Sequence, residues 1–175
     1  GTEGNTTLKN SVAIIDYNNN YFYSFSSLQD AIDYAKDGET VILISDVTLS
    51  DILVIDKAIT LDGNEKTLTS TAGRAINVET ESDVVIKNLT INAGERAINI
   101  INKPANVTVD NVTATANNNA VMRATSATGS NLTVNQSDFT GLATVNVASA
   151  NSKVEINNTK ITNCDGNAVE NYGAI

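Results

Sequence analysis

Two arginines that begin a repeated motif are the side chains in this sequence best suited to bind an anion. The segment "GRAINV" at residues 73–78 recurs as "ERAINI" at residues 95–100, so Arg74 and Arg96 occupy equivalent positions. A guanidinium group presents paired N–H donors that match the oxygens of a carboxylate. If the two motifs lie side by side, the arginines form a basic ladder for an acidic sugar. Glu95 and other nearby acids could instead pair with them, and both interpretations stay open.

Amide side chains follow the arginines in the same motifs. Asn77 and Asn99 end the two AIN segments, and Asn146 takes the same place in the later copy "TVNV". Amides both donate to and accept from sugar hydroxyls. The predicted ligand-binding residues are therefore Asn77, Asn99 and Asn146, with Arg74 and Arg96 beside them.

The carboxylates are too dispersed to indicate catalysis. Acid and base chemistry on sugars needs two carboxyl groups about 5–9 Å apart, and no column of acids runs through the repeats. The densest group, Glu79, Glu81 and Asp83, falls in one turn and is expected to be a solvated loop rather than a calcium site. The chain has no histidine to act as a general base and a single cysteine, Cys164. We therefore predict no catalytic residue, no metal site and no cofactor.

The repeat that carries these residues extends through most of the chain. Copies of the first motif begin at residues 75, 97, 120, 144 and 168, and a second motif follows as "VVIKNLTI", "VTVDNVTA", "LTVNQSDF" and "VEINNTKI". Apolar and polar residues alternate in both motifs, which is typical of strands. A leucine-rich repeat would need a helical return segment, and no helical periodicity appears. The pattern predicts an all-β, single-stranded parallel β-helix with about 22–24 residues per coil.

Alignment of the copies predicts which side chains point inward. The expected inward columns are Ile76, Ile98, Val121, Val145 and Val169; Val84, Val107, Leu132 and Val154; Ile86, Val109, Val134 and Ile156; and Ile91, Ala114, Phe139 and Ile161. The same alignment places Met122 on the outer face. An amide column, Asn88, Asn111, Gln136 and Asn158, is expected at a turn, because asparagine tolerates left-handed backbone and stacked amides can hydrogen-bond.

The two ends of the chain differ from the repeats. The segment "SSLQDAIDYAKDG" at residues 26–38 has the apolar spacing of a short helix, and the residues before it indicate a β-hairpin around residues 18–20. We therefore expect a strand pair and capping helix in residues 1–40 and coils in residues 41–175. Because "AVENYGAI" begins another coil, the chain is expected to be a piece of a longer solenoid whose open C-terminal coil associates end to end.

The order of these segments resembles a known superfamily. The run "YFYSFSSLQDAIDYAKDGETVILISDVTLSD", followed by "ITLDGNEKTL" and "VVIKNLTI", is similar to the start of right-handed parallel β-helix domains of the pectin-lyase-like superfamily. The likeness is greatest to domains of secreted and cell-wall-attached bacterial surface proteins. It implies a right-handed helix and an extracellular location. It leaves function open, since the superfamily contains polysaccharide lyases, glycoside hydrolases and adhesins.

Charge narrows the expected partners. A net charge of −9 and a pI of about 4.3 disfavour nucleic acid and anionic membrane surfaces. We expect a non-catalytic extracellular domain, adhesin-like or a stalk, with a host or environmental glycan or a protein receptor as its partner. The alternatives are a polysaccharide lyase or glycoside hydrolase whose active coils are absent or unrecognised, and a spacer without a ligand.

Overall fold

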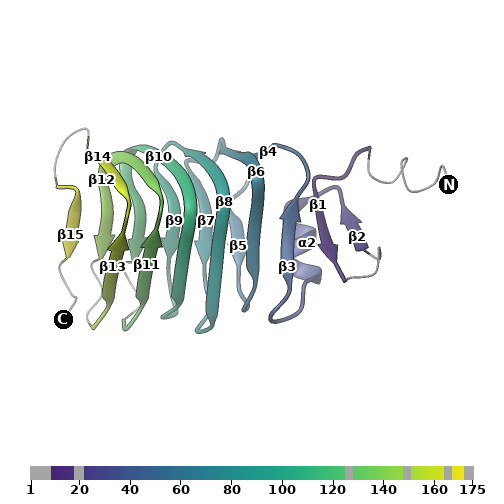
Figure 1. Ribbon diagram of the computed structural model, residues 1–175, viewed down its shortest axis with the longest axis horizontal. Coiled ribbons are helices and arrows are strands. Elements are labelled where there is room, and N and C mark those ends of the chain that lie inside the picture. Colours follow the sequence, from purple (N-terminus) through teal and green to yellow (C-terminus); the bar gives the residue numbers. More distant parts are fainter. Residues whose placement is uncertain (1–8, 18–21, 125–127, 148–150, 164–166, 172–175) are drawn as a thin grey trace.

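The chain winds into a parallel β-solenoid of about five turns, so the predicted fold class is confirmed. The computed structural model describes residues 9–17, 22–124, 128–147, 151–163 and 167–171. Figure 1 shows the coils stacked side by side, with a hairpin and a helix at one end and β15 at the other. Cys164 and the turn expected around residues 18–20 lie outside the described residues.

The elements follow the sequence pattern closely. The N-terminal part contains β1 (Ala13–Asp16), β2 (Phe22–Phe25) and α2 (Leu28–Tyr34). The first coils contain β3 (Thr40–Leu43), β4 (Val47–Leu49), β5 (Leu53–Ile55), β6 (Thr60–Ser70), β7 (Arg74–Val78), β8 (Asp83–Ala93) and β9 (Arg96–Ile100). The later coils contain β10 (Asn106–Ala124), β11 (Asn131–Asn135), β12 (Asp138–Val147), β13 (Lys153–Asn157), β14 (Lys160–Asn163) and β15 (Val169–Asn171).

Equivalent strands of successive coils pair in parallel and give the solenoid three faces. The first face contains β3, the starts of β6, β8 and β10, then β11 and β13. The second face contains β4, the ends of β6 and β8, the middle of β10, the start of β12, and β14. The third face contains β5, β7, β9, the ends of β10 and β12, and β15.

Apolar side chains from all three faces fill the centre of the solenoid. Ile76, Ile86, Ile91 and Ile98 are fully buried there, as the inward columns predicted. In the first predicted column, Val169 of β15 is 41% exposed, and one register position differs. Met122, rather than Val121, pairs with Ile98 and Val145, although the side chains of Met122 and Val121 are both fully buried. The cause is a shift in register between Ala116 and Ala120, where β10 holds more residues than β12.

The predicted amide column forms a turn between the first and second faces. Asn88, Asn111, Gln136 and Asn158 all have positive φ angles, between 47° and 54°. The Asn111 amide nitrogen donates to the Asn88 amide oxygen at 3.0 Å. Left-handed backbone is accessible to asparagine at lower cost than to most residues, so this column favours the bend in the four coils that contain it.

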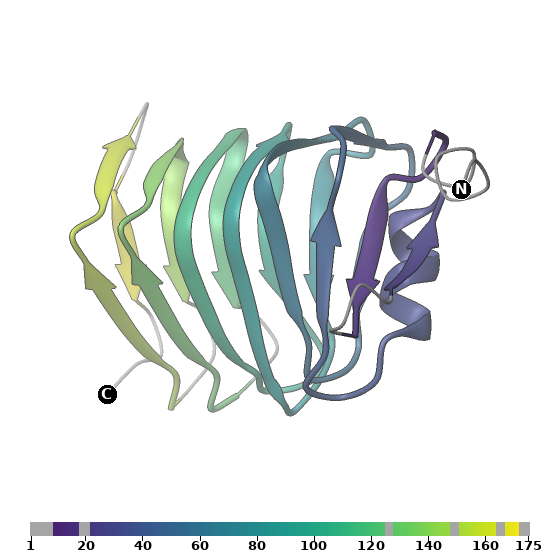
Figure 2. The same cartoon turned by 45° about the vertical axis from the view of Figure 1, so that its right-hand side comes forward.

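A small cap covers the N-terminal end of the coils. Figure 2 shows α2 lying beside the hairpin of β1 and β2 at that end. The Ser27 side chain caps the helix by accepting from the Asp30 backbone N–H at 3.3 Å. The helix is shorter than the predicted segment because the backbone turns extended at Ala35. Leu28, Ala31 and Ile32 are buried against the first coil, so the helix closes the core.

Candidate functional site

The two repeated arginines lie side by side on the third face and share one carboxylate. Arg74 and Arg96 are register partners in β7 and β9. Glu95 Oε1 lies 3.2 Å from Arg74 Nη2 and 3.8 Å from Arg96 Nη2. The structure therefore contains both arrangements that the sequence left open, a ladder of arginines and a pairing with Glu95.

A third arginine belongs to the same cluster. Arg123 is the register partner of Asn99 on one side and of Asn146 on the other. The alignment of the repeats missed Arg123, because the register shift in β10 moves Met122 into the core and Arg123 to the outer face. We call Arg74, Arg96 and Arg123 the arginine cluster. It places three cations of three successive coils on one face of an acidic protein.

The cluster contains hydrogen-bond donors that are not used. Only 8% of the Arg96 surface is exposed. The buried Nε atoms of Arg96 and Arg123 have no hydrogen-bond partner among the described residues. A buried donor without a partner costs free energy.

The pKa values of Arg96 and Glu95 are both lowered, and the positive charges of the cluster contribute to each shift. Burial lowers the pKa of the Arg96 guanidinium, and the charges of Arg123 and Arg74 lower it further, against the opposing effect of Glu95. Arg96 remains protonated at neutral pH, as arginine does in proteins. The hydrogen bond from Arg74 is the main cause that lowers the pKa of Glu95, with Arg96 and Arg123 contributing through charge and burial opposing them. Glu95 is thus ion-paired with Arg74 and Arg96, and the charge of Arg123 also favours its ionised form.

The predicted asparagines lie in the same row, but they differ in accessibility. Asn99 is fully buried; its side chain donates to Asn77 Oδ1 at 3.1 Å and accepts from Arg96 Nη1 at 3.5 Å. Asn77 is half-buried, and so is Asn146, which donates to Glu170 Oε2 at 2.5 Å. Asn99 is therefore placed to position Asn77 and Arg96, whereas Asn77 is partly open to solvent.

The acidic turn is held by amides of the next coil. Asn102 donates to Glu79 at 2.6 Å, and Asn106 donates to Asp83 at 2.8 Å. Among the residues that the structure describes, no group of three or more histidine, cysteine or acidic side chains is arranged to hold a metal ion. Within those same residues, no helix is long and apolar enough to cross a membrane.

The fold and the arginine cluster define the class of protein as a parallel β-solenoid with a basic row on one face. Comparison with protein-family models, curated proteins and solved structures finds no match to this chain.

Proposed function

We propose that this chain is a non-catalytic domain of an extracellular surface protein and that its third face binds an acidic glycan. The observation that carries the proposal is the arginine cluster, in which Glu95 is ion-paired with Arg74 and Arg96 and is influenced by Arg123 through charge alone. A carboxylate or sulfate group on a sugar would add negative charge beside these cations and accept hydrogen bonds from the Arg74 guanidinium, whose side chain is 30% exposed.

The solenoid would hold such a ligand on a rigid surface rather than in a deep pocket. Successive coils are about 4.8 Å apart, so the cluster extends along the axis in steps of that size. The half-buried Asn77 lies next to the arginines and can bond a sugar hydroxyl. Adhesin-like binding to an extracellular polysaccharide needs this combination of rigidity, length and repeated donors.

The test is a glycan-array screen of the purified domain, followed by titration of the strongest acidic and neutral glycans. Arg74→Gln and Arg123→Gln each remove one charged donor and leave a shorter, neutral polar side chain. Each is expected to weaken acidic-glycan binding about 10-fold or more, because a hydrogen bond to a charged group is worth about 1.5–3 kcal/mol. Lys103→Gln, at an exposed position in a turn, is the matched control for net charge and should leave binding unchanged.

Three results separate this proposal from its alternatives. Saturable binding that both arginine variants weaken supports a glycan-binding domain. Release of unsaturated or reducing sugars during the same incubation would instead indicate a lyase or a hydrolase. Absence of binding to any acidic glycan would reject the proposal and favour a spacer.

A further inference from the structure

The first coil has three strand edges at the N-terminal end of the solenoid, and two of them are covered. On the first face, β1 pairs with β3 in antiparallel register. On the third face, the Gln29 side chain takes the place of a strand beside β5: its Nε2 donates to the Val54 carbonyl at 3.0 Å and its Oε1 accepts from the Val54 N–H at 2.8 Å. Covering such edges prevents unwanted strand pairing.

The edge of β4, on the second face, has no equivalent cover from the part of the chain that the structure describes. The Leu49 carbonyl accepts from the Thr71 N–H at 2.9 Å, so Val47 and Leu49 direct their peptide groups toward the next coil. Peptide groups alternate between the two edges of a strand, and Thr48 therefore directs its N–H and C=O away from β6. Among the described residues, β4 pairs with β6 alone. Thr48 thus has the same position on the edge of β4 as Val54 has on the edge of β5, but no side chain of the described residues binds its backbone as Gln29 binds that of Val54.

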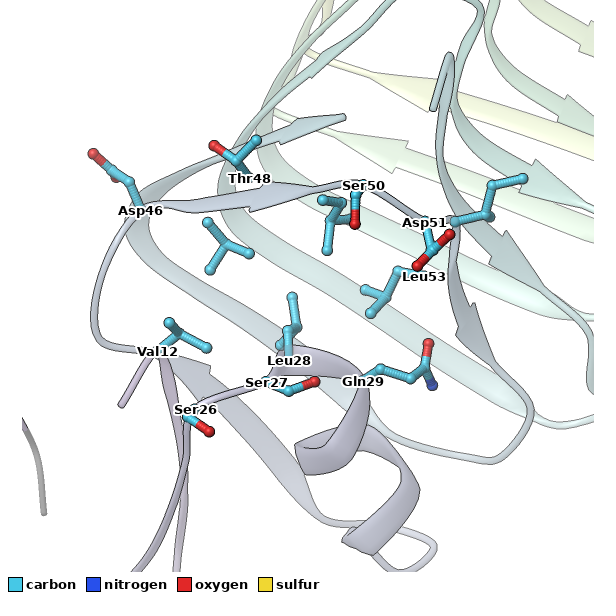
Figure 3. A pocket seen from close by; sticks show the side chains of 13 residues that line it. Val12, Ser26, Ser27, Leu28, Gln29, Asp46, Thr48, Ser50, Asp51 and Leu53 are labelled. Atoms are coloured by element: carbon cyan, nitrogen blue, oxygen red, sulfur yellow. The ribbon is translucent and has the colours of Figure 1, made fainter. Parts of the chain in front are cut away.

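A pocket of about 410 Å³ lies in front of this edge. Figure 3 shows Thr48 and Ser50 on one wall and Leu28, Ser27 and Gln29 of the cap on the other. Apolar side chains, among them Val12, Leu28 and Leu53, line its inner part. Asp46 and Asp51 flank β4 on either side, and none of the described residues that line the pocket is basic. The site therefore combines an open strand edge, an apolar interior and negative charge at both ends.

We propose that this pocket binds an extended, basic peptide segment of a partner protein by adding it as a strand to β4. Strand addition to an open edge draws affinity from main-chain hydrogen bonds and specificity from alternate side chains. Asp46 and Asp51 are five residues apart, which is at most about 16 Å, because the chain is extended over Val47–Leu49 and bends at Ser50 and Asp51. A hexapeptide with lysine at both ends spans that length, and alternating valines between them can enter the apolar interior. An acidic segment, including a second copy of this chain of net charge −9, is disfavoured by the two carboxylates.

The test uses a fluorescent, end-blocked hexapeptide of sequence Lys-Val-Thr-Val-Thr-Lys and fluorescence polarisation at low salt. Three controls accompany it: a peptide with proline at its third position, a peptide with glutamate in place of both lysines, and a neutral oligosaccharide as competitor. The protein variants are Thr48→Pro, which removes the free N–H, and Thr48→Val, which keeps the backbone and changes only an exposed side chain. Asp51→Asn removes one charge at an exposed position. Amide hydrogen exchange at Thr48 is measured with and without the hexapeptide.

The proposal predicts binding in the range of about 10–100 μM, corresponding to roughly 5–7 kcal/mol. Thr48→Pro should lose binding at least 10-fold, Thr48→Val should retain it, and Asp51→Asn should weaken it about two- to five-fold. The peptide should slow exchange of the Thr48 amide, a result that does not depend on any variant folding. Equal binding by the proline peptide, tighter binding by the glutamate peptide, displacement by the neutral sugar, or unchanged Thr48 exchange in the presence of saturating peptide would each overturn the proposal. Absence of binding at millimolar peptide would do so as well.

Discussion

Replacing Gln29 with alanine should open the third face of the solenoid at its first strand. The Gln29 amide makes two hydrogen bonds to the Val54 backbone and a third, at 2.8 Å, to the exposed Asp33 side chain. Each bond to Val54 is worth about 0.5–1.5 kcal/mol, and the exposed pair between positions i and i+4 about 0.2–0.5 kcal/mol. Gln29→Ala should therefore lower the free energy of unfolding by about 1–3.5 kcal/mol.

Urea denaturation followed by circular dichroism measures this loss, and Asp33→Ala is the matched control. Asp33→Ala removes only the exposed bond and should cost a few tenths of a kcal/mol. Hydrogen exchange of the Val54 amide adds a local measurement, because its acceptor in the native structure is the Gln29 side chain. If Gln29→Ala is no less stable than Asp33→Ala, or if the Val54 amide exchanges at the wild-type rate, the view that Gln29 covers this edge is wrong.

Three further substitutions test other parts of the fold. Gly63→Ala would place a Cβ 2.6 Å from Leu89 Cβ, so urea titration should show a loss of about 1–3 kcal/mol, whereas Gly94→Ala, with its nearest atom at 3.8 Å, should be nearly neutral. Asn111→Ala puts alanine at a φ of 54° and removes an amide bond of the ladder; thermal unfolding should show a loss of about 1–3 kcal/mol, with Asn111→Gly less affected. The folded-state pKa of Glu95 is lowered, so its contribution to stability is complete above the unfolded pKa of about 4.3 and is lost as pH falls through the folded pKa. Glu95→Gln should therefore be less stable than wild type at pH 7, and the urea midpoints of the two proteins should converge as the pH falls through the lowered folded-state pKa of Glu95.

The solenoid could be predicted from the sequence because its repeat is almost regular. Inward positions such as Ile86 and Val109 are separated by nearly constant steps, and in the structure they are register partners. The turn at Asn88 was predictable for a related reason, since asparagine is favoured in left-handed backbone and recurs at the matching place. Regular spacing and the backbone preference of asparagine can both be read directly from the sequence.

The cap could be predicted only in part, because its decisive contacts are long-range. The helix spacing and the Ser27 cap are local and were visible in the sequence. The bonds from Gln29 to Val54 join residues 25 positions apart, and a glutamine on a short helix has no pattern that indicates such a partner. The open edge at Thr48 likewise follows from what the cap leaves uncovered, which depends on the folded arrangement.

The missed arginine shows how charge could have corrected the alignment. Constant spacing placed Val121 inward and Met122 outward, which leaves Arg123 on the inward side. The centre of the solenoid is lined by fully buried aliphatic side chains such as Ile98 and Val145, and an unpaired guanidinium there would cost several kcal/mol. Moving the alignment by one residue puts Met122 in the core and Arg123 beside Asn99 on the outer face, as in the structure. The extra length in β10 that makes this shift possible is therefore also what brings the third cation to the arginine cluster.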